Sequence, residues 1–144
     1  MNLIAYYSMY FVFGLAFAWL NLTLQSAFLT SLLTSSLLVL QVALLAINTT
    51  ARTALLSKLK ELGNDFKAKF QSTVKAMNEA LIEQILIIFF TGLILIIYLS
   101  PNVLTNPSMR MVSEALLVGL LMASIQIVFD TSKAIMIILE DQVK

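Results

Sequence analysis

Residues 51–83 read ARTALLSKLKELGNDFKAKFQSTVKAMNEALIE and carry six of the nine lysines and arginines of this 144-residue chain. Two strongly apolar stretches precede this central segment and two follow it. The chain is 60% hydrophobic and only 12% charged, which leaves too few polar residues to cover a soluble globule of this size. The sequence therefore predicts a membrane protein.

Four stretches are long enough to be transmembrane helices, which need about 20 mostly apolar residues. The third reaches this length only with an extra turn at its start, and the fourth contains one carboxylate, Glu114. We expect spans at about residues 2–20, 27–47, 81–100 and 111–129. The fold class is thus predicted to be all-α, a polytopic protein with a single membrane domain over residues 1–144.

The first stretch resembles a secretory signal in length but differs from one in its flanks. It has no basic n-region, and it carries bulky aromatic residues rather than a small-residue cleavage site. Tyrosine and tryptophan are typical of membrane interfaces, where their rings lie at the headgroup level. We therefore interpret the stretch as a retained span with Tyr6, Tyr7, Tyr10 and Trp19 near its ends.

The cations predict the orientation. They lie in the central segment and near the C-terminus, at Lys133 and Lys144, and Arg110 alone lies in another connection. The positive-inside rule places cation-rich connections in the cytoplasm. With four spans, both termini are then cytoplasmic, in a multi-pass protein of the cell inner membrane.

The central segment also has an apolar face. Apolar residues recur at spacings of three, four or seven, which is typical of an amphipathic helix, and Gly63 interrupts them at a site suited to a helix end. We predict a cytoplasmic helical hairpin over residues 50–80 that extends the second and third spans. The tail, residues 131–144, is predicted to extend the fourth span in the same way.

Polar residues line one side of the second span. The offsets of 4, 7 and 7 place them within about 40° of one another on an α-helix, so we expect them to face protein or water rather than lipid. Two interpretations stay open, the lining of a water-filled path and hydrogen bonding between neighbouring helices. The residues are Thr30, Thr34, Gln41 and Asn48.

A second seam runs along the fourth span. Gly119 and Ala123 suit close helix packing. Asp130 and Lys133, one turn apart, are predicted to form an ion pair at the inner boundary or a charged ring in an oligomer. Glu114 follows Arg110 by four residues and is expected to pair with it, with a selectivity role as the alternative.

The cationic face of the hairpin is expected to lie against lipid headgroups. Attraction to anionic headgroups, about 1 kcal/mol per cation near the surface, is sufficient to explain it. A docking surface for a soluble partner is the alternative, and direct nucleic-acid binding is disfavoured because no aromatic residues alternate with the cations. The face comprises Arg52, Lys58, Lys60, Lys67, Lys69 and Lys75.

Enzymatic signatures are missing from the sequence. It contains no cysteine and no histidine, so thiolate chemistry and the usual zinc ligands are excluded. It has only four glycines, and none form a phosphate-binding loop. We expect no enzyme activity, no cofactor and no metal site.

Arg52-Thr53, Leu56 and the run from Lys58 to Gly63, directly after the second span, resemble small four-pass membrane proteins of bacterial phage exclusion and defence, the RexB-like proteins and Kiwa membrane subunits. The resemblance implies a homo-oligomer in the inner membrane that changes permeability or senses infection.

The leading functional hypothesis is a homo-oligomeric channel-like or membrane-perturbing effector or sensor, consistent with the polar side of the second span. The alternatives are a membrane anchor that recruits a soluble partner through the cationic hairpin, and a phage holin.

Overall fold

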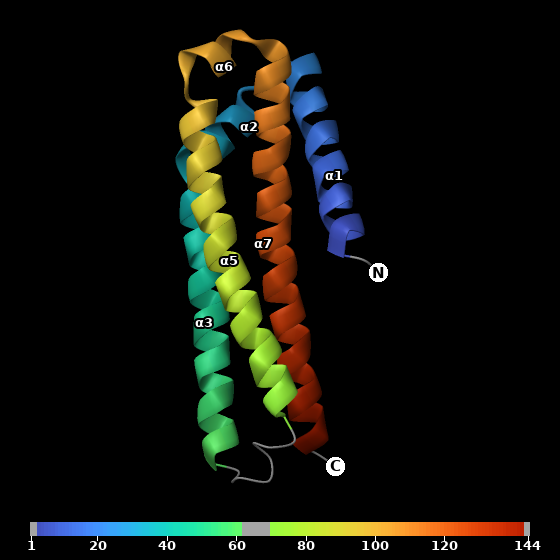
Figure 1. Ribbon diagram of the computed structural model, residues 1–144, viewed down its shortest axis with the longest axis vertical. Coiled ribbons are helices and arrows are strands. Elements are labelled where there is room, and N and C mark those ends of the chain that lie inside the picture. Colours follow the sequence, from blue (N-terminus) through green and yellow to red (C-terminus); the bar gives the residue numbers. More distant parts are fainter. Residues whose placement is uncertain (1–2, 62–69, 143–144) are drawn as a thin grey trace.

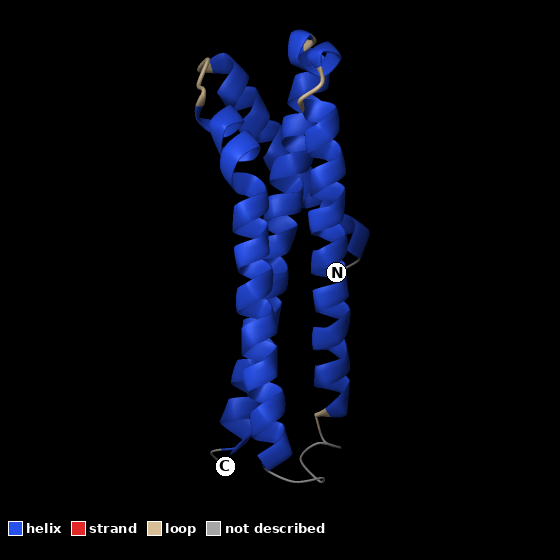
Figure 2. Cartoon of the chain, turned by 90° about the vertical axis from the view of Figure 1, so that its left-hand side faces the viewer, coloured by secondary structure: helices blue, strands red, loops and turns tan. Residues whose placement is uncertain are grey.

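The structure is a computed structural model that describes residues 3–61 and 70–142. Those ranges are helical apart from short turns, which confirms the predicted all-α class (Figure 2). In chain order the elements are α1 (Leu3–Thr23), α2 (Phe28–Ser31), the π-helical turn η1 (Leu32–Ser36), α3 (Leu37–Glu61), α5 (Gln71–Tyr98), α6 (Pro101–Thr105) and α7 (Pro107–Gln142).

Within the described residues, three helical stretches are long and apolar enough to cross a membrane, namely Phe28–Lys58, Gln71–Tyr98 and Pro107–Ile137. They correspond to the second, third and fourth predicted spans. The first predicted span is the 21-residue helix α1, which is not among the three.

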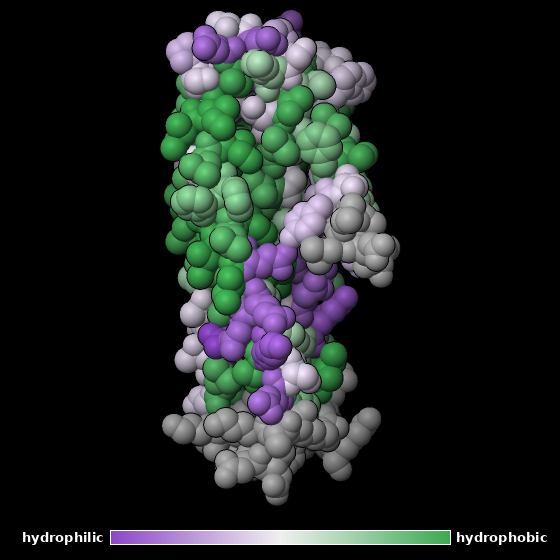
Figure 3. Space-filling model, in the orientation of Figure 1, coloured by the Kyte–Doolittle hydropathy of each residue, from purple (hydrophilic) through white to green (hydrophobic). Residues whose placement is uncertain are grey.

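The long helices form an elongated bundle (Figure 1). In the orientation of Figure 1, α3 runs downward, α5 upward and α7 downward, while α1 packs against the upper part of α7. All three long helices continue below the N-terminal end of α1. On the visible face, hydrophilic residues cap the top, apolar residues cover most of the upper half, and hydrophilic residues gather in the lower half beside some apolar ones (Figure 3).

The predicted hairpin is described in part. Helix α3 continues past the apolar stretch to Glu61, and α5 begins at Gln71 and runs without a break into the third span. The predicted tip at Gly63, together with Lys67 and Lys69, lies outside the described residues. Leu55, Phe70 and Met77 form a buried cluster against α7, as the amphipathic pattern led us to expect.

Helices α1 and α7 approach closely where both carry small residues. A Cβ atom added at Gly14 would lie 2.1 Å from the backbone oxygen of Ala115, and one at Gly119 would lie 3.5 Å from the backbone oxygen of Tyr10. Ala18 and Ala115 are fully buried. Close packing of small residues is typical of helix pairs in membranes.

Candidate functional site

The π-helical turn sets which side of the second span faces inward. Leu33 and Leu37 are fully buried, and Gln41 and Asn48 continue the same face of α3. Thr34 was expected on that face, but it is exposed, and its hydroxyl donates to the backbone oxygen of Thr30 at 2.8 Å.

The expectation for Thr34 is wrong because it assumed an uninterrupted α-helix, in which residues seven apart share a face. A π-turn accommodates one extra residue, so the helix before it is rotated relative to the helix after it. The rotation brings Leu33 inward in place of Thr34.

A set of polar side chains lies inside the bundle of α3, α5 and α7, where each is at most 4% exposed. We call this set the polar column. Two members were predicted from the sequence, and four were not. The members are Gln41, Asn48, Gln84, Thr91, Ser124 and Thr131.

Hydrogen bonding within the polar column is incomplete. The amide of Asn48 donates to the Gln84 side-chain oxygen at 2.9 Å, and Thr91 and Ser124 bond to backbone oxygens of their own helices. Among the described residues, Gln41 has no partner for either its amide nitrogen or its oxygen. A buried amide without hydrogen bonds costs about 2 kcal/mol or more, so the closed bundle is destabilised at this position.

The unpredicted members of the polar column follow a signal that the sequence does contain. Gln41 and Asn48 are seven residues apart, and so are Gln84 and Thr91 on α5 and Ser124 and Thr131 on α7. The same heptad spacing on each helix places one polar face toward a shared axis. From the sequence we predicted the polar side of the second span, and on the fourth span a different seam, so the pairs on α5 and α7 were missed.

A second polar cluster, the outer network, lies at the upper end of the bundle around Glu114, which is fully buried. Its carboxylate accepts hydrogen bonds from the Tyr98 hydroxyl at 2.9 Å, from Arg110 Nε at 2.9 Å and from the Asn21 amide at 3.3 Å. Arg110 also donates to the Thr30 hydroxyl at 2.7 Å. The predicted pairing of Arg110 with Glu114 is confirmed, and the network joins α1, α2, α5 and α7.

An apolar layer separates the outer network from the polar column. The order is the same on each long helix, since Leu95 lies between Tyr98 and Thr91 on α5, and Leu117 and Leu121 lie between Glu114 and Ser124 on α7. On the third helix, Leu33 and Leu37 lie between Thr30 and Gln41. The residues of this layer belong to one buried cluster: Leu33, Leu37, Leu95, Leu117 and Leu121.

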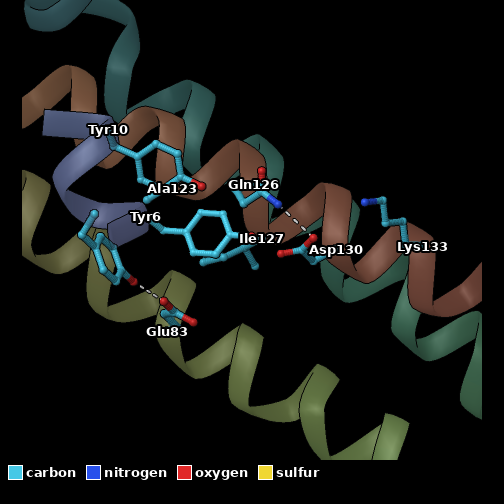
Figure 4. A pocket seen from close by; sticks show the side chains of 9 residues that line it. Tyr6, Tyr10, Glu83, Ala123, Gln126, Ile127, Asp130 and Lys133 are labelled. Atoms are coloured by element: carbon cyan, nitrogen blue, oxygen red, sulfur yellow. Dashed lines mark hydrogen bonds between the residues drawn. The ribbon is translucent and has the colours of Figure 1, made fainter. Parts of the chain in front are cut away.

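Asp130 and Lys133 do not form the expected ion pair. Asp130 accepts a hydrogen bond from Gln126 at 2.9 Å, and the Lys133 ammonium lies 4.4 Å from the centroid of the Phe129 ring. Each charge thus contacts a residue four positions earlier on α7 rather than the other charge. Both residues line an open cleft beside the lower end of α1 (Figure 4).

The cationic face of the predicted hairpin is only partly described. Lys75 is exposed and lies 3.8 Å from Glu79, and Lys58 is exposed as well. Arg52 is half-buried, with its Nε unpartnered in the described part of the chain. The side chain of Lys60 lies outside the described set, as do those of Lys67 and Lys69.

Comparison of the chain with protein-family models, with curated proteins and with solved structures finds no match. The resemblance to phage-exclusion proteins therefore stays a prediction. The features from which a function can be inferred are the polar column, the apolar layer and the outer network.

Proposed function

We propose that this protein is a channel-like membrane protein whose conducting path is the polar column and whose gate is the apolar layer above it. The observation that carries the proposal is Gln41, which is fully buried with both of its amide atoms unpartnered. Water entering the column would supply those hydrogen bonds. In an open state, water in the column would therefore hydrogen-bond to the polar groups of these residues.

The path needs no second copy of the chain to line it. The sequence analysis expected the polar side of the second span to find neighbours in an oligomer. Asn48 instead bonds to Gln84 and Thr30 to Arg110 of the same chain. A role in phage defence, as a holin or as an anchor for a soluble partner stays a prediction.

The topology that we propose has four spans. Helix α1 has 21 residues, which at 1.5 Å per residue gives about 31 Å and matches a hydrocarbon core of about 30 Å. It lies beside the upper, apolar part of the bundle (Figures 1 and 3). Both termini then lie on the side of the cationic central segment, which the positive-inside rule assigns to the cytoplasm of an inner-membrane protein.

The π-helical turn supplies a mechanism for gating. If η1 converted to regular α-helix, the preceding residues would rotate, and Thr34 would replace Leu33 in the apolar layer. Thr30, Thr34, Gln41 and Asn48 would then align as one polar face. A single change of helical register would thus make the apolar layer polar, and π-turns are frequent at functional sites.

Ion flux through liposomes that contain the purified protein tests the proposal. Gln41→Leu removes the unpartnered amide and stabilises the closed bundle by about 2 kcal/mol, so flux should fall at least about tenfold. Leu33→Ser places a hydroxyl in the apolar layer and should raise flux.

The matched control is Thr49→Leu, because Thr49 is an exposed residue of α3 that bonds only to its own helix in the described structure. This variant should leave flux unchanged. Equal flux through the wild type, Gln41→Leu and Leu33→Ser would contradict the proposed path and gate.

A further inference from the structure

An open cleft of about 270 Å³ lies beside the N-terminal end of α1, where α5 and α7 continue downward past it (Figures 1 and 4). Three tyrosines of α1 form one side of it, and α5 and α7 contribute two carboxylates and one lysine. Its volume is near the lower limit for small-molecule sites, about 300 Å³. The aromatic and charged side chains of its lining are Tyr6, Tyr7, Tyr10, Glu83, Asp130 and Lys133.

The two carboxylates each retain an oxygen for a ligand. Glu83 accepts the Tyr7 hydroxyl with one oxygen, and Asp130 accepts the Gln126 amide with one oxygen at 2.9 Å. In the described ranges, no further hydrogen bond engages the second oxygen of either group. Figure 4 shows Glu83 on α5 and the Gln126–Asp130 contact on α7, with Tyr6 between them.

The tyrosines add aromatic surface beside these carboxylates. The ring centroids of Tyr6 and Tyr10 are 6.5 Å apart, and those of Tyr7 and Tyr10 are 6.3 Å apart with the rings nearly perpendicular. Aromatic faces beside carboxylates are favourable surroundings for an ammonium group. With two carboxylates against one lysine, the lining carries a net charge of −1 and disfavours a purely anionic ligand.

Lys133 supplies the complementary charge for an anionic group. It is exposed, and its ammonium lies over the Phe129 ring at the rim of the cleft. The flexible lysine side chain can turn from this position toward a phosphate in the cleft. The cleft also lies close to where the surface changes from apolar to hydrophilic (Figure 3), the level at which tyrosines and lipid headgroups meet.

We infer that this cleft binds a phosphoethanolamine group, with its ammonium between the tyrosines and the carboxylates of Glu83 and Asp130 and its phosphate on Lys133. The group has two sources, the headgroup of phosphatidylethanolamine and free phosphoethanolamine. This site is independent of the proposed path, because none of its residues belongs to the polar column.

Native mass spectrometry of the full-length, delipidated protein in detergent tests the inference. The probes are phosphatidylethanolamine and phosphatidylglycerol with the same acyl chains, with free phosphoethanolamine as a competitor. Phosphatidylethanolamine should bind more tightly than phosphatidylglycerol. Asp130→Asn and Lys133→Gln should each weaken its binding on the order of tenfold, because each removes a charge-assisted contact.

The matched control is Glu79→Gln, which removes an exposed carboxylate outside the cleft and should leave binding unchanged. Competition by free phosphoethanolamine would identify the soluble group as a ligand, and its failure to compete would identify the lipid. Equal binding of the two lipids, or unaltered binding by both Asp130→Asn and Lys133→Gln, would overturn the inference. Asp130 and Lys133 are exposed, so folding is expected to survive either change.

Discussion

Glu114 and Gln41 are equally buried, yet their surroundings differ. Glu114 accepts hydrogen bonds from Asn21, Tyr98 and Arg110, while Gln41 makes none among the described residues. A buried charge with several hydrogen-bond partners holds the neighbouring helices together. A buried amide without partners instead favours any state of the protein in which water reaches it. The outer network therefore holds the helices together, and the polar column fits the conducting path that we propose.

Neutralising Glu114 should destabilise the fold. Glu114→Gln leaves the partly buried Arg110 without its counter-charge, and losing one partner of a buried pair costs on the order of 3 kcal/mol. Reversible unfolding in mixed micelles, followed by circular dichroism, should report this loss. Glu79→Gln is the control, because the exposed Lys75–Glu79 pair contributes little. A similar stability for the two variants would contradict the structural role of Glu114.

At this scale, one of the two predicted pairs within α7 formed, and the contacts that other helices make with it were not predictable. The pairing of Arg110 with Glu114 follows from a spacing of four residues. Tyr98 and Asn21 reach the same carboxylate from α5 and α1, and no local spacing relates them to it. The Asp130–Lys133 pair failed because Gln126 and Phe129 compete at similar spacings on α7.

Among the elements, the close contact between α1 and α7 requires a residue without a side chain at Gly14. Gly14→Ala would place a Cβ atom 2.1 Å from the backbone oxygen of Ala115, so the helices must separate. We expect a loss of about 1–3 kcal/mol in unfolding free energy, measured in the same micelles.

The control for Gly14 is another helical glycine. A Cβ atom at Gly92 would meet nothing within 4 Å, so Gly92→Ala should be neutral or should stabilise α5 by up to about 1 kcal/mol through helix propensity. If both alanine variants were stabilised, the close approach of α1 to α7 would be refuted.

The π-helical turn was not predictable from the sequence. Leu32–Ser36 contains no proline or glycine that would mark an irregular helix. The turn places Leu33 and Leu37 in a cluster with Leu95 and Leu117 from distant parts of the chain. Packing between helices, rather than local propensity, therefore decides the register at this point.

For the whole molecule, the proposed topology predicts which residues lie on the same side of the membrane. The chain contains no cysteine, so Asn102→Cys, in α6, and Lys58→Cys, near the end of α3, each introduce a single thiol. A membrane-impermeant maleimide should label Asn102→Cys from outside intact cells and Lys58→Cys only after permeabilisation. A tag at each terminus should, like the thiol of Lys58→Cys, be inaccessible from outside intact cells. Protection of one terminal tag but not the other would show that α1 does not cross the membrane.

The sequence by itself determined the helical class and the apolar stretches that form the three long helices. It also determined the continuation of α3 and α5 past their apolar parts. These features depend on composition and periodicity, which are local properties of the chain. The tertiary structure alone decided that Leu33 rather than Thr34 faces inward and that Gln84 and Thr91 join Gln41. It also decided that the outer network around Glu114 joins four elements, because each of these depends on which faces of distant helices meet.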